Sequence, residues 1–271
     1  MKKIYTLAIS FCIVISGNAA KTDTVLVYSK VMDTALKAVV IVPDSYQASN
    51  KNYPVVYLLH GLGGNYANWI KRVPEIETYA DLHEIIIVCT DGKNSWYFNN
   101  PTDSGSNFET YVAVEIPEFI DKNYRTIAHR KGRAITGLSM GGHGGLFLGM
   151  KHAKTFSACG SMSGAVDLKP FSERWGIGKF LGDTIPGFSW ADYTVMYLIE
   201  KPLSDSLSII IDCGTKDFFY ETNKRLHEKL SALNIAHDFI SRPGTHDWNY
   251  WKNAIQYQLL FFRNHFNSMK P

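Results

Sequence analysis

The sequence AITGLSMGGHGG, residues 134–145, places Ser139 between two glycines that each lie two positions away. The apolar run before the serine is typical of a buried strand, and the glycine-rich run after it can open a helix. A tight strand-to-helix turn brings neighbouring backbone close, and Gly137 and Gly141 would leave room for it. Because Gly-x-Ser-x-Gly arises by chance in about one chain of this length in ten, its meaning depends on the rest of the sequence.

Apolar runs recur along the chain, with helix-like segments between them. Two early runs, VLVYS and KAVVIVP, are typical of an antiparallel pair. The later runs are almost continuously apolar, as expected of parallel strands covered on both faces: PVVYLLHG, EIIIVCTDG, GRAITGLS, FSACGSMSG and LSIIIDCGT, with HDFISRPG as the last strand. Strands that alternate with helices predict an α/β fold with a mostly parallel sheet. No repeat or linker interrupts this rhythm, so residues 21–271 are expected to form one domain.

Two segments carry a helical stripe of apolar residues. The first, SNFETYVAVEIPEFIDKNY, starts with Ser106 and Glu109 at the spacing of a capping box, and Pro117 inside it is expected to kink or weaken the helix. The second, WNYWKNAIQYQLLFFRNHF, places six apolar residues on one face: Trp248, Trp251, Ile255, Leu259, Phe262 and Phe266.

Residues 165–205 do not follow this rhythm, because they form a long connection rich in aromatic residues. Connections of this length are often binding loops or covers. A helical excursion packed on its own aromatic side chains is the alternative, and both can hold together.

The first twenty residues predict a secretory signal peptide. Two lysines precede a short apolar run, and small residues follow near Ala19 and Ala20. The run is too short for a comfortable membrane span, and no later stretch reaches 18 unbroken apolar residues. We therefore expect residues 1–20 to be removed and the mature chain to be secreted or periplasmic, with no stable membrane span.

Charge and cysteine content exclude some classes of partner. The formal net charge is +3, and loss of Lys2 and Lys3 with the signal leaves +1. No basic block of the kind that nucleic-acid binding needs is present. Three cysteines remain in the mature chain, at positions 89, 159 and 213, each at the end of an apolar run, which favours buried thiols over disulfides. Nothing has zinc-ligand spacing, so neither a metal nor a cofactor is expected.

A serine hydroxyl needs a base to remove its proton. In the order Ser, acid, His the base comes late in the chain, and His246 in RPGTHDWNYW lies between the last strand and the last helix. His143 follows the serine on its helix and is expected to point away from the turn. Six other histidines are expected to be solvated on helices or their edges: His83, His129, His152, His227, His237 and His265.

The base in turn needs an acid, and the segment IIIDCGTKDFF offers two. Asp217 follows the strand and can reach the histidine loop, whereas Asp212 lies within the strand and is expected to be a structural carboxylate. The turn in LLHGLGGN can direct backbone N–H groups at the same place, and we expect the Leu62 and Met140 N–H groups to form an oxyanion hole. His60 is expected to be a buried residue that holds this turn, with a catalytic role as the alternative.

With these residues assembled, the chain resembles the esterase D family of α/β-hydrolases. That family includes S-formylglutathione hydrolases, acetylxylan and feruloyl esterases, and mycolyltransferases. The resemblance spans about residues 24 to 265 and is carried by HGLGG, DGKNSWYFN, FETYVAVEIPEFIDKNYRT, GLSMGGHGG, GTKD and GTHDW. It implies an α/β-hydrolase fold, with Ser139, Asp217 and His246 as a catalytic triad. It also implies that Trp96, in NSWYF, lines the acyl pocket, with a packed aromatic as the alternative.

The resemblance implies a serine carboxylesterase that works through an acyl-enzyme. Because the signal peptide argues against a cytosolic glutathione thioester, we expect acetyl or feruloyl esters of carbohydrates, small or polysaccharide-linked, as substrates. Aromatic side chains in residues 165–205 would suit a sugar or phenolic ring. The alternatives are an acyltransferase of the mycolyltransferase type, a thioesterase resembling S-formylglutathione hydrolase, and a non-catalytic carbohydrate-binding protein. Nothing in the sequence indicates an oligomeric state.

Overall fold

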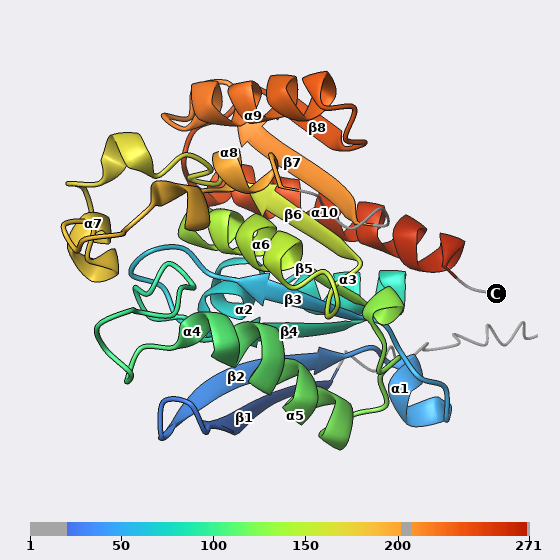
Figure 1. Ribbon diagram of the computed structural model, residues 1–271. Coiled ribbons are helices and arrows are strands. Elements are labelled where there is room, and N and C mark those ends of the chain that lie inside the picture. Colours follow the sequence, from blue (N-terminus) through green and yellow to red (C-terminus); the bar gives the residue numbers. More distant parts are fainter. Residues whose placement is uncertain (1–20, 202–206, 270–271) are drawn as a thin grey trace, which may run out of the picture.

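A computed structural model describes residues 21–201 and 207–269 (Figure 1). The signal peptide predicted for residues 1–20 lies outside the described residues. Within those ranges, eight strands form one sheet in the order β1-β2-β4-β3-β5-β6-β7-β8. No helix in the described part of the chain has the length and apolar character to cross a membrane.

The early antiparallel pair is confirmed. Strand β1 (Lys21–Ser29) pairs with β2 (Thr34–Val42), and β2 continues antiparallel onto β4 (Ile86–Thr90). All later pairings in the sheet are parallel. The parallel strands are β4 together with β3 (Val55–Leu59), β5 (Arg133–Gly137), β6 (Ala158–Met162), β7 (Ser208–Gly214) and β8 (Asp238–Arg242).

Continuous apolar runs form these strands because both faces of the sheet are covered. In β3, β4 and β6 every residue is buried. Alternate side chains enter two separate cores, so that Tyr57 packs in one and Val56 and Leu58 pack in the other. The edge strand β8 is less buried. The fold is that of an α/β-hydrolase, as predicted.

Helices divide between the two faces (Figure 1). The front face in Figure 1, over the core that holds Tyr57, carries α4 (Phe108–Thr110), α5 (Ile116–Asn123), α6 (Met140–Lys151), α7 (Ile177–Leu181), α8 (Val195–Leu198) and α9 (Tyr220–Ala232). The opposite face carries α2 (Asn68–Arg72), α3 (Ile76–His83) and α10 (Trp248–Ser268). A short helix, α1 (Ser45–Ala48), follows β2. The stripe predicted for α10 is buried from Trp251 to Phe266, and Trp248 at its start is half-buried.

The segment around Pro117 is helical but discontinuous. A π-helical turn, Tyr111–Glu115, separates α4 from α5, and Pro117 lies in the first turn of α5. The π-helical turn directly before the proline breaks the regular α-helical hydrogen-bond pattern, which a residue without an N–H cannot join.

The capping box predicted from Ser106 and Glu109 was wrong. The N-cap residue of α4 is Asn107, and it makes no side-chain capping bond. Glu109 instead lies 3.0 Å from both Lys151 Nζ and His152 Nε2 at the end of α6. Pairing with two basic groups takes the carboxylate away from the helix start.

Histidine burial also differs from expectation at two of six positions. His83 and His265 are buried, and burial lowers the pKa of each imidazole. The His265 ring bonds the hydroxyls of Ser157 at 2.7 Å and Ser208 at 3.0 Å, so packing of α10 against the sheet takes it out of solvent. Cys89, Cys159 and Cys213 are buried free thiols, as predicted.

The aromatic-rich segment 165–205 contains short helical turns, described as far as residue 201: Lys169–Phe171, α7, Trp190–Asp192 and α8. Part of it packs on its own aromatic side chains. Phe188 stacks on Tyr193 with centroids 5.3 Å apart, and the Trp190 ring meets Phe188 edge-on at 5.1 Å. Trp175, in the same segment, reaches the site described next.

Candidate active site

Ser139 lies in a strained turn between β5 and α6. Its φ of 55° and ψ of −117° are unusual for a residue with a side chain, and such a conformation costs about 1–3 kcal/mol. Its N–H donates to Met162 O at 2.9 Å. A Cβ on Gly141 would lie 2.6 Å from His60 O, and one on Gly137 would lie 2.6 Å from Gly141 O. The turn therefore requires both glycines.

The structure brings Ser139, His246 and Asp217 into one hydrogen-bonded chain. His246 Nε2 lies 2.9 Å from Ser139 Oγ, and His246 Nδ1 lies 2.8 Å from Asp217 Oδ2. The other carboxylate oxygen accepts from Phe219 N–H at 2.8 Å, and the Asp217 side chain is fully buried. Since a carboxylate accepts from Nδ1–H, Nε2 is left to accept the serine proton.

The three residues are far apart in the sequence, and they come together because each one follows the carboxyl end of a parallel strand. Ser139, Asp217 and His246 follow β5, β7 and β8, and the carboxyl ends of parallel strands share one edge of the sheet. Within β7, Asp212 Oδ2 accepts from Arg242 Nη2 at 2.6 Å, and its Oδ1 accepts from the Tyr250 hydroxyl.

This buried network ties β7, β8 and α10 around the loop that carries His246. Burial raises the pKa of Asp212 to about 6, against the opposing effect of its two partners. Asp212 is therefore a structural carboxylate, as expected, and makes no contact with the imidazole.

Aromatic rings surround the imidazole of His246. Its ring centroid lies 4.3 Å from that of Phe218, 5.4 Å from that of Phe219 and 4.9 Å from that of Trp251. These contacts restrict rotation of the imidazole. The sequence reasoning assigned no role to Phe218 or Phe219, although both directly follow Asp217 in KDFF.

The loop after β3 faces Ser139. In the described part of the chain, neither the Leu62 N–H nor the Met140 N–H has a hydrogen-bond acceptor. A Cβ on Gly61 would lie 3.4 Å from Ser139 Cβ, so this loop runs beside the serine. Both N–H groups are thus free to bind an oxygen, and their role as an oxyanion hole stays a prediction.

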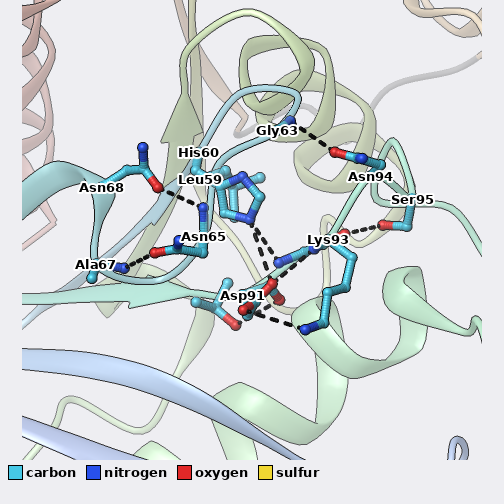
Figure 2. A network of polar contacts seen from close by, with 12 residues as sticks. Leu59, His60, Gly63, Asn65, Ala67, Asn68, Asp91, Lys93, Asn94 and Ser95 are labelled. Atoms are coloured by element: carbon cyan, nitrogen blue, oxygen red, sulfur yellow. Dashed lines mark hydrogen bonds and ion pairs between the residues drawn. The ribbon is translucent and has the colours of Figure 1, made fainter. Parts of the chain in front are cut away.

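His60 holds this loop, as Figure 2 shows. Its Nε2 accepts from Gly92 N–H at 2.9 Å, and its Nδ1–H donates to Gly61 O at 2.8 Å. Close by, Asn94 Oδ1 accepts from Gly63 N–H at 2.8 Å. Both ring nitrogens of His60 are engaged and the residue is buried, so the structure agrees with the holding role rather than a catalytic one.

A pocket of about 280 Å³ opens above Ser139. It is lined by the loop Gly61–Gly64, Asn68, Trp96, Leu138, Ser139, Trp175, Phe218, Phe219, His246, Trp248 and Trp251. Trp96 is 2% exposed and its ring lies 6.0 Å from that of Trp175, so it both lines the pocket and packs. Trp175 belongs to the segment 165–205, which therefore covers the site as well as packing on itself. No group of three or more His, Cys, Asp or Glu residues in the described ranges is placed to hold a metal ion.

Comparison with known proteins identifies the family of this chain. Residues 29–262 match the model of the Esterase family, described as "Putative esterase". The chain belongs to this esterase family. Its fold is that of an α/β-hydrolase.

Several relatives are esterases by name. An acetyl esterase of Caldicellulosiruptor saccharolyticus is 27% identical over 253 residues, which cover 84% of this chain and 92% of that protein. An esterase of Mycobacterium tuberculosis is 37% identical over 136 residues, or 48% of this chain, but the match spans only 29% of that longer protein. The solved structure of a ferulic acid esterase has a TM-score of 0.79 and 28% identity, and the match covers 92% of this chain and 99% of that chain.

Proposed function

We propose that this esterase hydrolyses acyl esters through an acyl-enzyme on Ser139, with His246 as general base and Asp217 as the group that orients and stabilises the imidazole. The hydrogen-bonded chain from Asp217 through His246 to Ser139 carries the proposal, because each step lies at 2.8 or 2.9 Å. The strained turn holds the serine hydroxyl in this position at the edge of the sheet.

In acylation, Ser139 Oγ attacks the ester carbonyl carbon while His246 Nε2 takes its proton. The carbonyl oxygen becomes negative and accepts from the Leu62 and Met140 N–H groups. Collapse of the intermediate breaks the ester C–O bond, and His246 Nε2–H gives its proton to the leaving alcohol oxygen. A water molecule then attacks the acyl-enzyme by the reverse sequence, which releases the acid and restores Ser139.

For the substrate, we propose acetyl or hydroxycinnamoyl esters of carbohydrates. The aromatic lining of the pocket supports a flat or small acyl group, since flat apolar faces pack well on aromatic rings. The names of two relatives, acetyl esterase and ferulic acid esterase, support the same classes. The proposed export signal in residues 1–20 would bring the enzyme to polysaccharides outside the cell.

A hydrolysis panel tests this proposal with p-nitrophenyl acetate, methyl ferulate and acetylated xylan. We expect turnover of at least one ester, and a loss of about 10⁴-fold or more in kcat for Ser139→Ala with an unchanged circular dichroism spectrum. Turnover that persists in that variant would exclude the serine mechanism. A transferred acyl product with an added alcohol would point to an acyltransferase, and polysaccharide binding without turnover would point to a binding protein.

A further inference from the structure

The pocket above Ser139 has two walls that come from opposite faces of the sheet. Trp96 and Phe219 belong to the apolar core on the α6 side, and Trp175 contacts both of their rings. Trp251 belongs to the core on the α10 side, and Trp248 packs against that core. We name Trp96, Trp175 and Phe219, together with Phe218, the insertion wall. Trp248 and Trp251, together with Asn68, are the α10 wall.

The imidazole of His246 lies between the two walls. Its ring contacts Phe218 on the insertion wall and Trp251 on the α10 wall. When the carbonyl carbon of an ester lies next to Ser139 Oγ, its acyl group can therefore lie against one wall and its alcohol group against the other.

The insertion wall offers hydrocarbon surface to a ligand. Phe218 and Phe219 carry no polar side-chain atom, and the indole nitrogen of Trp96 is covered by protein and has no partner among the described residues. Aromatic faces of this kind suit an acyl group.

The α10 wall adds a polar group to its aromatic surface. Asn68 Oδ1 accepts from Asn65 N–H at 2.6 Å, which fixes the orientation of the amide because only the oxygen can accept. Its Nδ2 is turned to the other side (Figure 2) and has no acceptor in the described part of the chain. This amide nitrogen is an accessible donor in a residue that lines the same pocket as Trp248.

We propose that Asn68 and Trp248 form a subsite for the sugar on the alcohol side of the ester. A sugar ring presents a C–H face, which packs on an aromatic ring, and hydroxyl oxygens, which accept from an amide N–H. Half-buried Trp248 is held edge-to-face by Trp69 at 5.3 Å and Trp251 at 5.5 Å, so it gives a fixed platform. This subsite rests on the proposed function, since it assumes an ester split at Ser139.

The chain offers a matched pair of variants. Asn68→Asp keeps the oxygen that accepts from Asn65 N–H but removes the free amide donor. Asn94→Asp makes the same chemical change in the neighbouring loop, where Asn94 Oδ1 accepts from Gly63 N–H but the residue does not line the pocket. The two variants add the same charge, so Asn94→Asp controls for the charge, and the ratio of two substrates removes effects on the chemistry that both substrates share.

The experiment compares kcat/KM for esters that share an acyl group and differ in the alcohol: methyl ferulate against feruloylated arabinose, and p-nitrophenyl acetate against acetylated xylobiose. We expect Asn68→Asp to lower the ratio of sugar ester to simple ester about fivefold, and Trp248→Leu to lower it as well. Trp248→Phe should restore part of the loss, and Asn94→Asp should leave the ratio unchanged.

A ratio that stays constant in Asn68→Asp and Trp248→Leu, in an enzyme that hydrolyses both esters, would overturn the subsite and leave the proposed function standing. Binding of xylobiose to Ser139→Ala, followed by NMR, tests the subsite without hydrolysis. Binding that Asn68→Asp weakens supports the subsite even in a protein that hydrolyses none of these esters, and binding that Asn68→Asp leaves unchanged overturns it.

Discussion

The Nε2 atom of His60 accepts a hydrogen bond from the backbone N–H of Gly92 at 2.9 Å and so joins two loops that follow adjacent parallel strands (Figure 2). One loop carries the Leu62 N–H, and the other carries Trp96 at the pocket wall. Tyr97 adds to this junction, because its hydroxyl donates to His60 O at 2.9 Å. The position of the Leu62 N–H beside Ser139 therefore depends on a residue that makes no hydrogen bond to the serine–histidine–aspartate chain.

Removal of the His60 side chain is expected to slow the reaction and destabilise the fold. His60→Ala leaves the Gly92 N–H buried without an acceptor, which costs about 1–3 kcal/mol. The loosened loop should lower kcat about tenfold, less than the 10²–10³-fold loss typical of removing an oxyanion donor outright. Steady-state kinetics and thermal denaturation measure both effects. His227→Ala, at a half-buried position outside the pocket lining, serves as the control for kcat. An unchanged kcat in His60→Ala would argue against the holding role.

A methyl group at Gly141 should disturb the serine turn. The Cβ of Gly141→Ala would lie 2.6 Å from His60 O and 2.8 Å from Leu59 C, and these backbone atoms can yield only if the strand or α6 moves. We expect a loss of about 1–3 kcal/mol in the free energy of unfolding and reduced activity. Gly105→Ala is the matched control, because there the Cβ meets only the exposed Asp103 side chain at 3.1 Å. Equal melting temperatures for the two variants would contradict the close approach.

Trp175 should set the preference for the acyl group. It is 41% exposed, lines the pocket and contacts Trp96 and Phe219, so Trp175→Ala removes aromatic surface from the insertion wall. We expect KM for methyl ferulate to rise about tenfold, in line with the loss of an aromatic contact worth about 1 kcal/mol or more, with a smaller change for p-nitrophenyl acetate. Trp190→Ala, in the same segment but outside the pocket, should change neither. Equal losses on both esters in Trp175→Ala would show that Trp175 does not discriminate acyl groups.

Acid should destabilise the fold through His143. Burial lowers the pKa of this imidazole from 6.5 to about 3. The unfolded chain therefore binds a proton that the folded chain does not, so stability falls as the pH drops below about 6.5 and the loss levels off near pH 3. The contribution is about 1.4 kcal/mol per pH unit. His143→Asn retains a donor for Ala165 O but does not titrate, and denaturant melts from pH 7 to pH 4 should show a shallower decline than in the unsubstituted protein.

A control for the histidine test is His129→Asn, since His129 is exposed. That variant should follow the unsubstituted protein across the same pH range. An identical decline in His143→Asn would mean that other groups cause the acid sensitivity.

Much of the fold follows from the sequence, because strands buried on both faces must be apolar throughout. The position of each residue relative to its strand also distinguished the structural aspartate from the one that contacts the histidine. Asp212 lies inside such a strand and is held by Arg242 and Tyr250, whereas Asp217 lies beyond the strand and reaches His246. The serine turn, the acid loop and the histidine loop each follow a strand, so one edge of the sheet collects them.

Features that depend on packing between distant elements were not predictable in this way. His265 looked like a solvated helix residue, and only the position of α10 against Ser157 and Ser208 buries it. The sequence does not distinguish Trp175 from Trp190, because both are tryptophans of one aromatic segment. Of the two, only Trp175 lines the pocket. Glu109 has the right spacing for a cap, but basic groups 42 and 43 residues later compete for its carboxylate.

Stoichiometric labelling with a fluorophosphonate probe, mapped by peptide mass spectrometry, tests the central claim most directly. If His246 removes the proton of Ser139 Oγ, one label should attach per chain, on Ser139, and His246→Ala should slow its attachment by orders of magnitude. Ser139→Ala should take up no label. Labelling of another residue, or equally fast labelling of Ser139 without the imidazole, would contradict the account.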